Sequence, residues 1–111
     1  MEAKTLAALI AGAEKWERNA AVTLENVHIH ADSCALCKLF LLKNDHCGGC
    51  PVNDVTGNQC DNSPWLRADD ALFIWEHASN AKDRRNAAAR FRRAAKAEAK
   101  FLRSLIPADA A

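Results

Sequence analysis

Tyrosine is absent from this sequence of 111 residues, and glycine (four residues), proline (three) and methionine (one) are scarce. No apolar run approaches the roughly 18 residues that a membrane-spanning helix needs, so we expect no transmembrane span. The first residues include Glu2 and Glu14 and lack a basic region ahead of an apolar run, which is not the pattern of a secretory signal. These absences predict a cytoplasmic protein that does not enter a membrane.

The sequence also lacks the patterns that mark common catalytic sites. It has no glycine-rich loop for a phosphate, no nucleophile with a base at a known spacing, and no pair of carboxylates within an apolar segment. Asp69-Asp70 fits the acidic start of a helix, and Glu76-His77 fits an exposed polar pair. We therefore expect a protein that is not an enzyme.

Helical periodicity is what the sequence does contain, over two long segments. Apolar residues recur at steps of three and four across residues 4–27, which predicts an amphipathic helix there. Pro64 stands at a typical first helical position, and neither glycine nor proline follows before Pro107. This predicts a long helix over 64–106 that is basic in its second half. A kink or break in this helix near Ser79-Asn80 is an open alternative.

Between these helices, residues 34–60 combine cysteines with Gly, Pro, Asn and Asp. Ser33 is a candidate N-cap for a short helix from about Cys34 to Leu42, and the rest of the segment predicts an irregular loop. The expected fold is a single all-α domain over 1–111. It is an antiparallel helical hairpin with a long C-terminal helix, and the cysteine loop and short helix lie between the two long helices.

All five cysteines lie within 27 residues, in the order C-x2-C, nine residues, C-x2-C, nine residues, C. In a reducing compartment, clustered cysteines bind metal more often than they form disulfides. Two C-x2-C pairs are typical of a structural zinc site, in which four thiolates close the coordination sphere and no water is activated. The sequence therefore predicts Zn²⁺ as a cofactor that holds the loop in place.

Five cysteines exceed the four ligands that zinc needs. We expect Cys34, Cys37, Cys47 and Cys50 as the ligands, with Cys60 as the replacement for one member of the second pair. Three histidines are further candidate replacements: His28, His30 and His46.

Other uses of the cysteines stay open at this point. Cys50-Pro51 follows a C-x2-C pair as in iron–sulfur proteins, although the full bacterial spacing is absent. Cys47-Gly48-Gly49-Cys50 is similar to a thiol–disulfide exchange motif, but no βαβ pattern surrounds it. A disulfide framework conflicts with the expected cytoplasmic location.

Charge is distributed unevenly along the chain. Residues 1–79 have a net charge of −5, whereas residues 80–106 have a net charge of +7. If a stripe of Ala88, Phe91, Ala95, Ala99 and Leu102 is buried, a continuous basic surface lies opposite it. The candidate binding residues on this surface are Arg85, Arg90, Arg92, Arg93, Lys96, Lys100 and Arg103.

Such a surface suits the phosphates of a nucleic acid, which is the partner that we expect. Two alternatives remain open. The cations can form a solvated face that pairs with acids such as Glu14 and Glu17, or they can meet an acidic protein partner. Pairing of two chains into a homodimer through the long helix is a further option.

The stretch CALCKLFLLKNDHCGGCPVNDVTGNQCDNSPW, residues 34–65, resembles small cysteine-rich proteins of tailed bacteriophages. The resemblance rests on the paired C-x2-C motifs, the Cys-Pro step, the glycine turn and a last cysteine before an aromatic residue. It covers about a third of the chain and transfers no catalytic residue. It implies a phage accessory protein in the cytoplasm of a bacterial host. The alternative function is therefore to bind a host protein, such as defence or transcription machinery, and to inhibit or redirect it.

Overall fold

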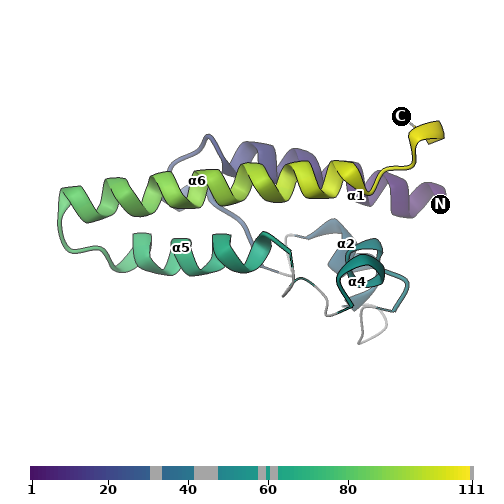
Figure 1. Cartoon of the computed structure of the whole chain (residues 1–111), viewed down its shortest axis with the longest axis horizontal. Helices are drawn as coiled ribbons and strands as arrows, with labels where there is room; N and C mark the ends of the chain where they lie inside the picture. Colours follow the sequence, from purple (N-terminus) through teal and green to yellow (C-terminus); the bar gives the residue numbers. More distant parts are fainter. Residues whose placement is uncertain (31–33, 42–47, 58–59, 61–62, 111) are drawn as a thin grey trace.

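A computed structural model describes residues 1–30, 34–41, 48–57, 60 and 63–110 of the chain. Within these ranges the protein is all-helical and has no β-strand, which confirms the predicted fold class (Figure 1). The elements in chain order are α1 (Ala3–Asn19), η1 (Leu24–Asn26), α2 (Ala35–Leu39), α4 (Pro51–Thr56), α5 (Trp65–His77), α6 (Ala81–Ser104) and η3 (Ala108–Ala110). None of the described helices has both the length and the apolar character to cross a bilayer.

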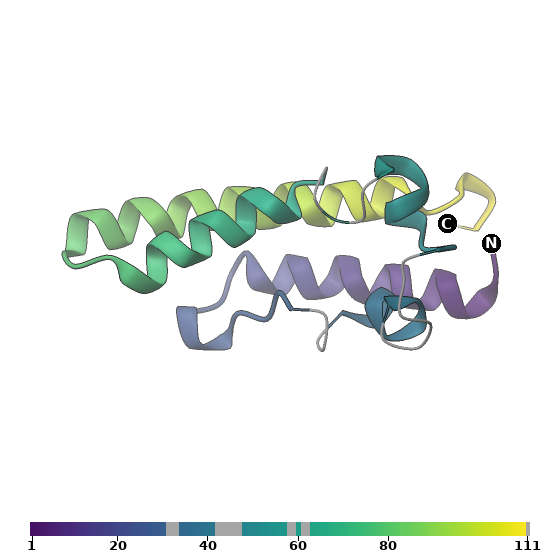
Figure 2. The same ribbon diagram turned by 90° about the horizontal axis from the view of Figure 1, so that it is seen from below.

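The long helix α6 contacts both α1 and α5 and runs antiparallel to each of them (Figures 1 and 2). The short helices α2 and α4 lie near the end of the molecule that is far from the α5–α6 turn, and both chain termini are at that same end (Figure 1). The two-helix hairpin expected from the sequence is thus a three-helix arrangement, with α6 as the shared partner.

The expected helix over 64–106 is divided into α5 and α6. Ala78 has an extended backbone, and Asn80 is the N-cap of α6. The Asn80 side chain accepts a hydrogen bond from the backbone N–H of Asp83 at 2.8 Å and donates one to the Asp83 carboxylate at 2.9 Å. These two hydrogen bonds cap the first turn of α6, where backbone N–H groups have no partner within the helix. They stabilise a helix start at Asn80, which favours two helices over one continuous helix.

The helix expected over 4–27 ends early, at Asn19. The buried Asn19 amide donates to the backbone carbonyl of His28 at 2.8 Å and accepts from the backbone N–H of His28 at 3.2 Å. These two bonds fold the chain back beside α1, so that residues 24–26 form only the 3-10 turn η1. A polar side chain that satisfies distant backbone groups competes with continuation of the helix.

The short helices α2 and α4 come before and after residues 42–47, which lie outside the described ranges. In α2 the N-cap is Cys34, whereas Ser33 and Leu42 lie outside the described residues. The helix α4 stands where an irregular loop was expected. Pro51 occupies its first turn, and Gly57 ends it with a left-handed backbone (φ 73°), which is the usual pairing of proline at the start with glycine after the end.

The core is the contact of α6 with α1 and α5. The predicted stripe is confirmed, since Ala88, Phe91, Ala95, Ala99 and Leu102 are all buried. Phe91 is fully buried, with its ring 6.4 Å from Trp16 of α1 and 5.7 Å from Trp75 of α5 between centroids. One phenylalanine thus joins all three long helices, and the alanines around it let the backbones approach closely.

Replacing Phe91 by Ala is expected to lower the free energy of unfolding by about 3–5 kcal/mol, because the cavity would lie between two tryptophans. Phe73→Ala is the matched control, since Phe73 is also in a long helix but is 63% exposed. It should change stability by less than about 1 kcal/mol. Chemical denaturation of both variants measures the difference, and equal losses would contradict this description of the core.

Candidate functional site

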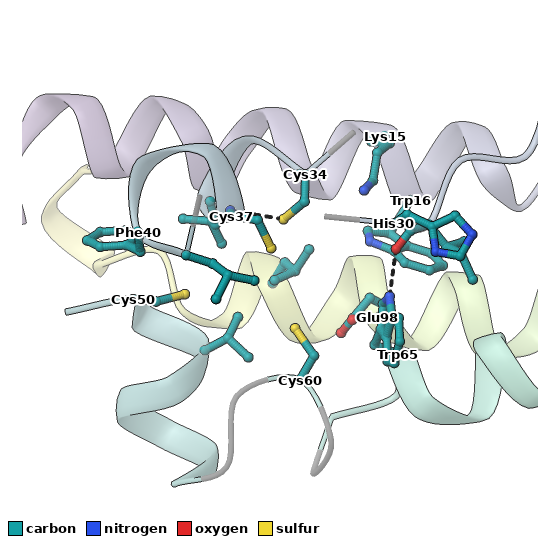
Figure 3. Close-up of a pocket in the computed structure, with 16 residues that line it drawn as sticks. Lys15, Trp16, His30, Cys34, Cys37, Phe40, Cys50, Cys60, Trp65 and Glu98 are labelled. Carbon is teal, nitrogen blue, oxygen red and sulfur yellow. Dashed lines mark hydrogen bonds between the residues drawn. The ribbon is translucent and has the colours of Figure 1, made fainter. Parts of the chain in front are cut away.

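Four of the five cysteines face one cavity of about 300 Å³ at the α2/α4 end of the molecule (Figure 3). Cys34 and Cys37 come from the start of α2, Cys50 from the N-cap of α4, and Cys60 from the segment before α5. In Figure 3 the sulfurs of Cys34 and Cys37 lie together on one side, and that of Cys60 lies opposite them. Segments far apart in the sequence therefore bring their thiols to a common space.

Cys47 lies outside the described residues, so the preferred ligand set that contains it stays a prediction. The sequence also offers Cys60 as a replacement for one member of the second pair. If Cys60 replaces Cys47, the ligand set is Cys34, Cys37, Cys50 and Cys60, and all four of these cysteines line the cavity. Within the described ranges, however, no three Cys, His, Asp or Glu side chains are grouped so that they could hold a single metal ion.

The candidate histidines have different surroundings. His28 is exposed, and its backbone N–H and C=O groups form hydrogen bonds with the side-chain amide of Asn19. His30 is largely exposed but lines one edge of the cavity (Figure 3). His46 lies outside the described residues. Of the three, only His30 is shown near the thiols.

The surroundings of Cys34 stabilise its thiolate form. Hydrogen bonding from Cys37 lowers the pKa of the Cys34 thiol to about 6, with a further contribution from the Lys15 ammonium, although burial acts in the opposite direction. The backbone N–H of Cys37 donates to the Cys34 sulfur at 3.3 Å. A thiol of this kind readily loses its proton. The thiolate that results is the form of cysteine that binds metals.

Lys15 of α1 is the cation at this site. Its side chain is half-buried against the Trp16 ring, with 5.4 Å from the ammonium nitrogen to the ring centroid. Burial lowers the pKa of Lys15, while the nearby thiols of Cys34, Cys37 and Cys60 and the Glu98 carboxyl act to raise it. Lys15 therefore places one positive charge beside a group of thiols.

Glu98 of α6 is the second ionisable group that the sequence did not reveal. It is only 3% exposed, and its Oε1 atom has no hydrogen-bond partner. Burial raises the pKa of Glu98 to about 7, despite the opposing effects of Ser63 and Lys15. A signal was present in the sequence, because Glu98 falls on the apolar stripe of an otherwise basic helix.

The Ser63 hydroxyl explains how a buried Glu98 is accommodated. Its oxygen lies 2.9 Å from the Cys60 carbonyl and 3.3 Å from Glu98 Oε2, and it accepts from the Trp65 backbone N–H at 3.2 Å. A hydroxyl has one proton to donate. That proton can go to the Cys60 carbonyl or to Glu98 Oε2, and donation to Glu98 lowers the pKa of this carboxyl against the larger effect of burial.

The basic surface lies on the other side of α6 from the buried stripe. Six of its seven candidate residues are exposed: Arg85, Arg90, Arg93, Lys96, Lys100 and Arg103. Arg92 and Arg103 make contacts within the protein. The Arg92 guanidinium stands over the Trp75 ring at 5.5 Å, and Arg103 forms two hydrogen bonds to Glu17 of α1, at 2.6 and 3.1 Å.

Comparisons of the chain with protein-family models, with curated proteins and with solved structures found no match. The resemblance of residues 34–65 to phage proteins therefore stays a prediction from the sequence.

Replacing Glu98 by Gln tests the buried carboxyl. Because the pKa of Glu98 is raised from 4.5 to about 7 in the folded protein, the native chain loses stability as pH rises from about 4.5 to 7. The variant should be more stable than the native protein by about 1–3 kcal/mol at pH 8 and nearly equal to it at pH 4. Denaturant unfolding across this pH range measures the difference.

Glu14→Gln is the control for this experiment, since Glu14 is an exposed residue of α1. Its unfolding free energy should follow that of the native protein at each pH. If Glu98→Gln behaves in the same way as the control, the buried carboxyl is ionised without cost and the description of its surroundings is wrong.

Proposed function

We propose that this protein is a small non-catalytic helical module that binds nucleic acid through the exposed basic face of α6. We define the basic face as Arg85, Arg90, Arg93, Lys96 and Lys100, which are the exposed candidate residues other than Arg103, whose side chain pairs with Glu17. In the same proposal, the cysteine cavity holds a metal group that stabilises the fold. The sequence predicts zinc for this role.

The observation that carries the proposal is that five cations are exposed along α6, whereas two exposed acids border them: Asp83, which lines a depression with Arg90, and Glu17, which lines one with Lys96 and Lys100. Beyond Asp83 in its first turn, α6 contains one acidic residue, Glu98, and this residue is buried on the opposite side. In the part of the chain that the structure describes, the one ion pair made by α6 is that of Arg103 with Glu17. The charge of the basic face is therefore available to a partner.

The dimensions of this face suit a phosphate backbone. Arg85 to Lys100 span about 22 Å along the helix at 1.5 Å per residue. Duplex DNA presents a phosphate about every 1.7 Å of its axis, so several phosphates lie within that length. Lys96, Lys100 and Arg103 also border a shallow depression of about 570 Å³ between α6 and the end of α1. A sugar–phosphate backbone could bind there.

The cysteine cavity supports the same module without taking part in binding. It lies where α1, α2, α4 and α6 meet, so a metal group there would fix the segment from Cys34 to Cys60 against the long helices. The basic face extends from this end of α6 toward the α5–α6 turn. We infer that the metal stabilises the fold and that α6 provides the contact surface.

The basic face is tested by measuring binding to duplex and single-stranded nucleic acid between about 50 and 300 mM salt. Binding should weaken steeply, with a log–log slope of about 0.7–0.9 for each phosphate neutralised. The triple variant Arg90→Ala, Arg93→Ala, Lys100→Ala should lower that slope by about two to three units and leave sequence preference unchanged. Its fold should persist, because alanine favours helix and the buried stripe is untouched.

A control with the same loss of charge is available elsewhere. Lys4, Arg18 and Arg67 are exposed on α1 and α5, and their combined replacement by Ala should change the salt slope far less. If both triple variants lose binding equally, the attraction comes from net charge and not from the basic face. If the native protein shows no binding at about 50 mM salt but captures a host protein after nuclease treatment, the rival function is correct.

A further inference from the structure

We propose that the nucleic acid bound by this protein is single-stranded and that one of its bases stacks on the exposed ring of Phe73. The inference rests on the proposed function, because the phosphates of the strand meet the basic face of α6. It adds a second kind of contact, in which an aromatic ring and a base pack against each other. Proteins that bind single strands combine these two contacts, a cationic path for the backbone and aromatic rings for the bases.

Phe73 differs from the other exposed apolar residues of the protein. The large apolar side chains that are exposed within the described ranges are Met1, Val55, Leu66, Phe73 and Ile74. Phe73 is the most exposed of them, at 63%, and it has the one aromatic ring among them. Packing of the core therefore does not explain an aromatic ring at this position of α5.

The ring of Phe73 is held in place by His77, one turn further along α5. The two rings are stacked, with their centroids 4.2 Å apart and their planes inclined by 29°. The His77 Nδ1 atom lies 2.8 Å from the Phe73 carbonyl oxygen, so the tautomer with a proton on Nδ1 donates a hydrogen bond there. Because a ring that is already held loses less freedom on binding, this arrangement favours stacking of a further ring.

Phe73 and the basic face border the same depression, which lies at the turn between α5 and α6 (Figure 1). Phe73 and His77 line it from α5, and Asn86 and Arg90 line it from α6. Arg90 is exposed and belongs to the basic face. A strand that follows the basic face therefore places a phosphate at Arg90 and a neighbouring base at Phe73.

The charges around the depression suit a nucleotide in this orientation. Four cations in the first three turns of α6 are exposed: Lys82, Arg84, Arg85 and Arg90. The exposed acid among them is Asp83, which lines the depression and accepts a hydrogen bond from Asn80 at 2.9 Å. Its carboxylate repels a phosphate but can accept a hydrogen bond from the amino group of a base. The base therefore belongs in the depression and the phosphate at Arg90.

A contact with Phe73 selects single strands over duplexes. In a duplex each base is already stacked and paired, so a ring on a protein surface reaches a base only if that base is unstacked or flipped out. In a single strand the bases are free to stack on aromatic side chains. The basic face binds the phosphates of either form, whereas Phe73 adds affinity for the single strand alone.

The experiment compares binding of a labelled oligothymidylate of about 12 nucleotides with binding of a duplex of the same length, at about 50 mM salt. The native chain should bind the single strand more tightly. Phe73→Leu keeps an apolar side chain but removes the ring, so it should weaken single-strand binding by about 5- to 150-fold and leave duplex binding unchanged. The log–log salt slope should stay that of the native protein, because stacking releases no counterions.

Two further variants separate stacking from other causes. Leu66→Ala is the matched control, since Leu66 is a 40% exposed apolar residue of α5 that lies outside the lining of the depression. Its affinity for both probes should equal that of the native protein. Phe73→Trp should keep the preference for the single strand, and oligothymidylate should quench its added indole emission. Circular dichroism of all three variants should match the native spectrum, because both positions are exposed.

The outcomes separate this inference from the proposed function. Equal single-strand binding by the native protein and Phe73→Leu would overturn the inference, and a lower salt slope in the triple variant of the basic face would leave the proposed function standing. A native protein that binds neither probe would contradict both. Sedimentation at the same concentration tests for self-association. Native dimers that Phe73→Leu and Leu66→Ala both dissociate would show that this surface of α5 pairs two copies of the chain, which would overturn the stacking role.

Discussion

The close contact of α6 with two other helices is the constraint on which the rest of the structure depends. Phe91 is enclosed by Trp16 and Trp75, and alanine occupies five of the eight buried positions of α6. Small side chains bury little area each, so stability has to come from close approach over the whole length of the helix. Because one face of α6 is used for this packing, its cations are confined to the other face.

The sequence predicts α6 well because a single physical pattern, apolar residues at helical spacing beside charged ones, determines both of its faces. It predicts the cysteine region less well, since local patterns do not report tertiary partners. Asn19 ends α1 by bonding to His28, and Pro51 with Gly57 forms α4 from a segment that looks irregular. Glu98 and Lys15 face the cysteine cavity because α1 and α6 meet there; the position of Glu98 on the apolar stripe indicates its burial, but not that it lies beside the cysteines.

The two functional features are separated in space but share one element. Leu102 and Glu98 of α6 help to line the cavity, while Lys96 and Lys100, on neighbouring turns, lie on the basic face. The same two turns of α6 therefore carry part of the cavity wall and part of the positive charge.

The reciprocal capping between Asn80 and Asp83 has a consequence for how the chain folds. It fixes the start of α6 with groups three residues apart, so the boundary between α5 and α6 is set by contacts that are close in sequence. Contacts of this kind close a short loop at little entropic cost, whereas the contact of Glu17 in α1 with Arg103 in α6 joins residues 86 apart and closes a long one. Folding should therefore proceed from the α5–α6 turn toward the cysteine end. The end of the bundle that carries the cysteines would then be the last part of the fold to close.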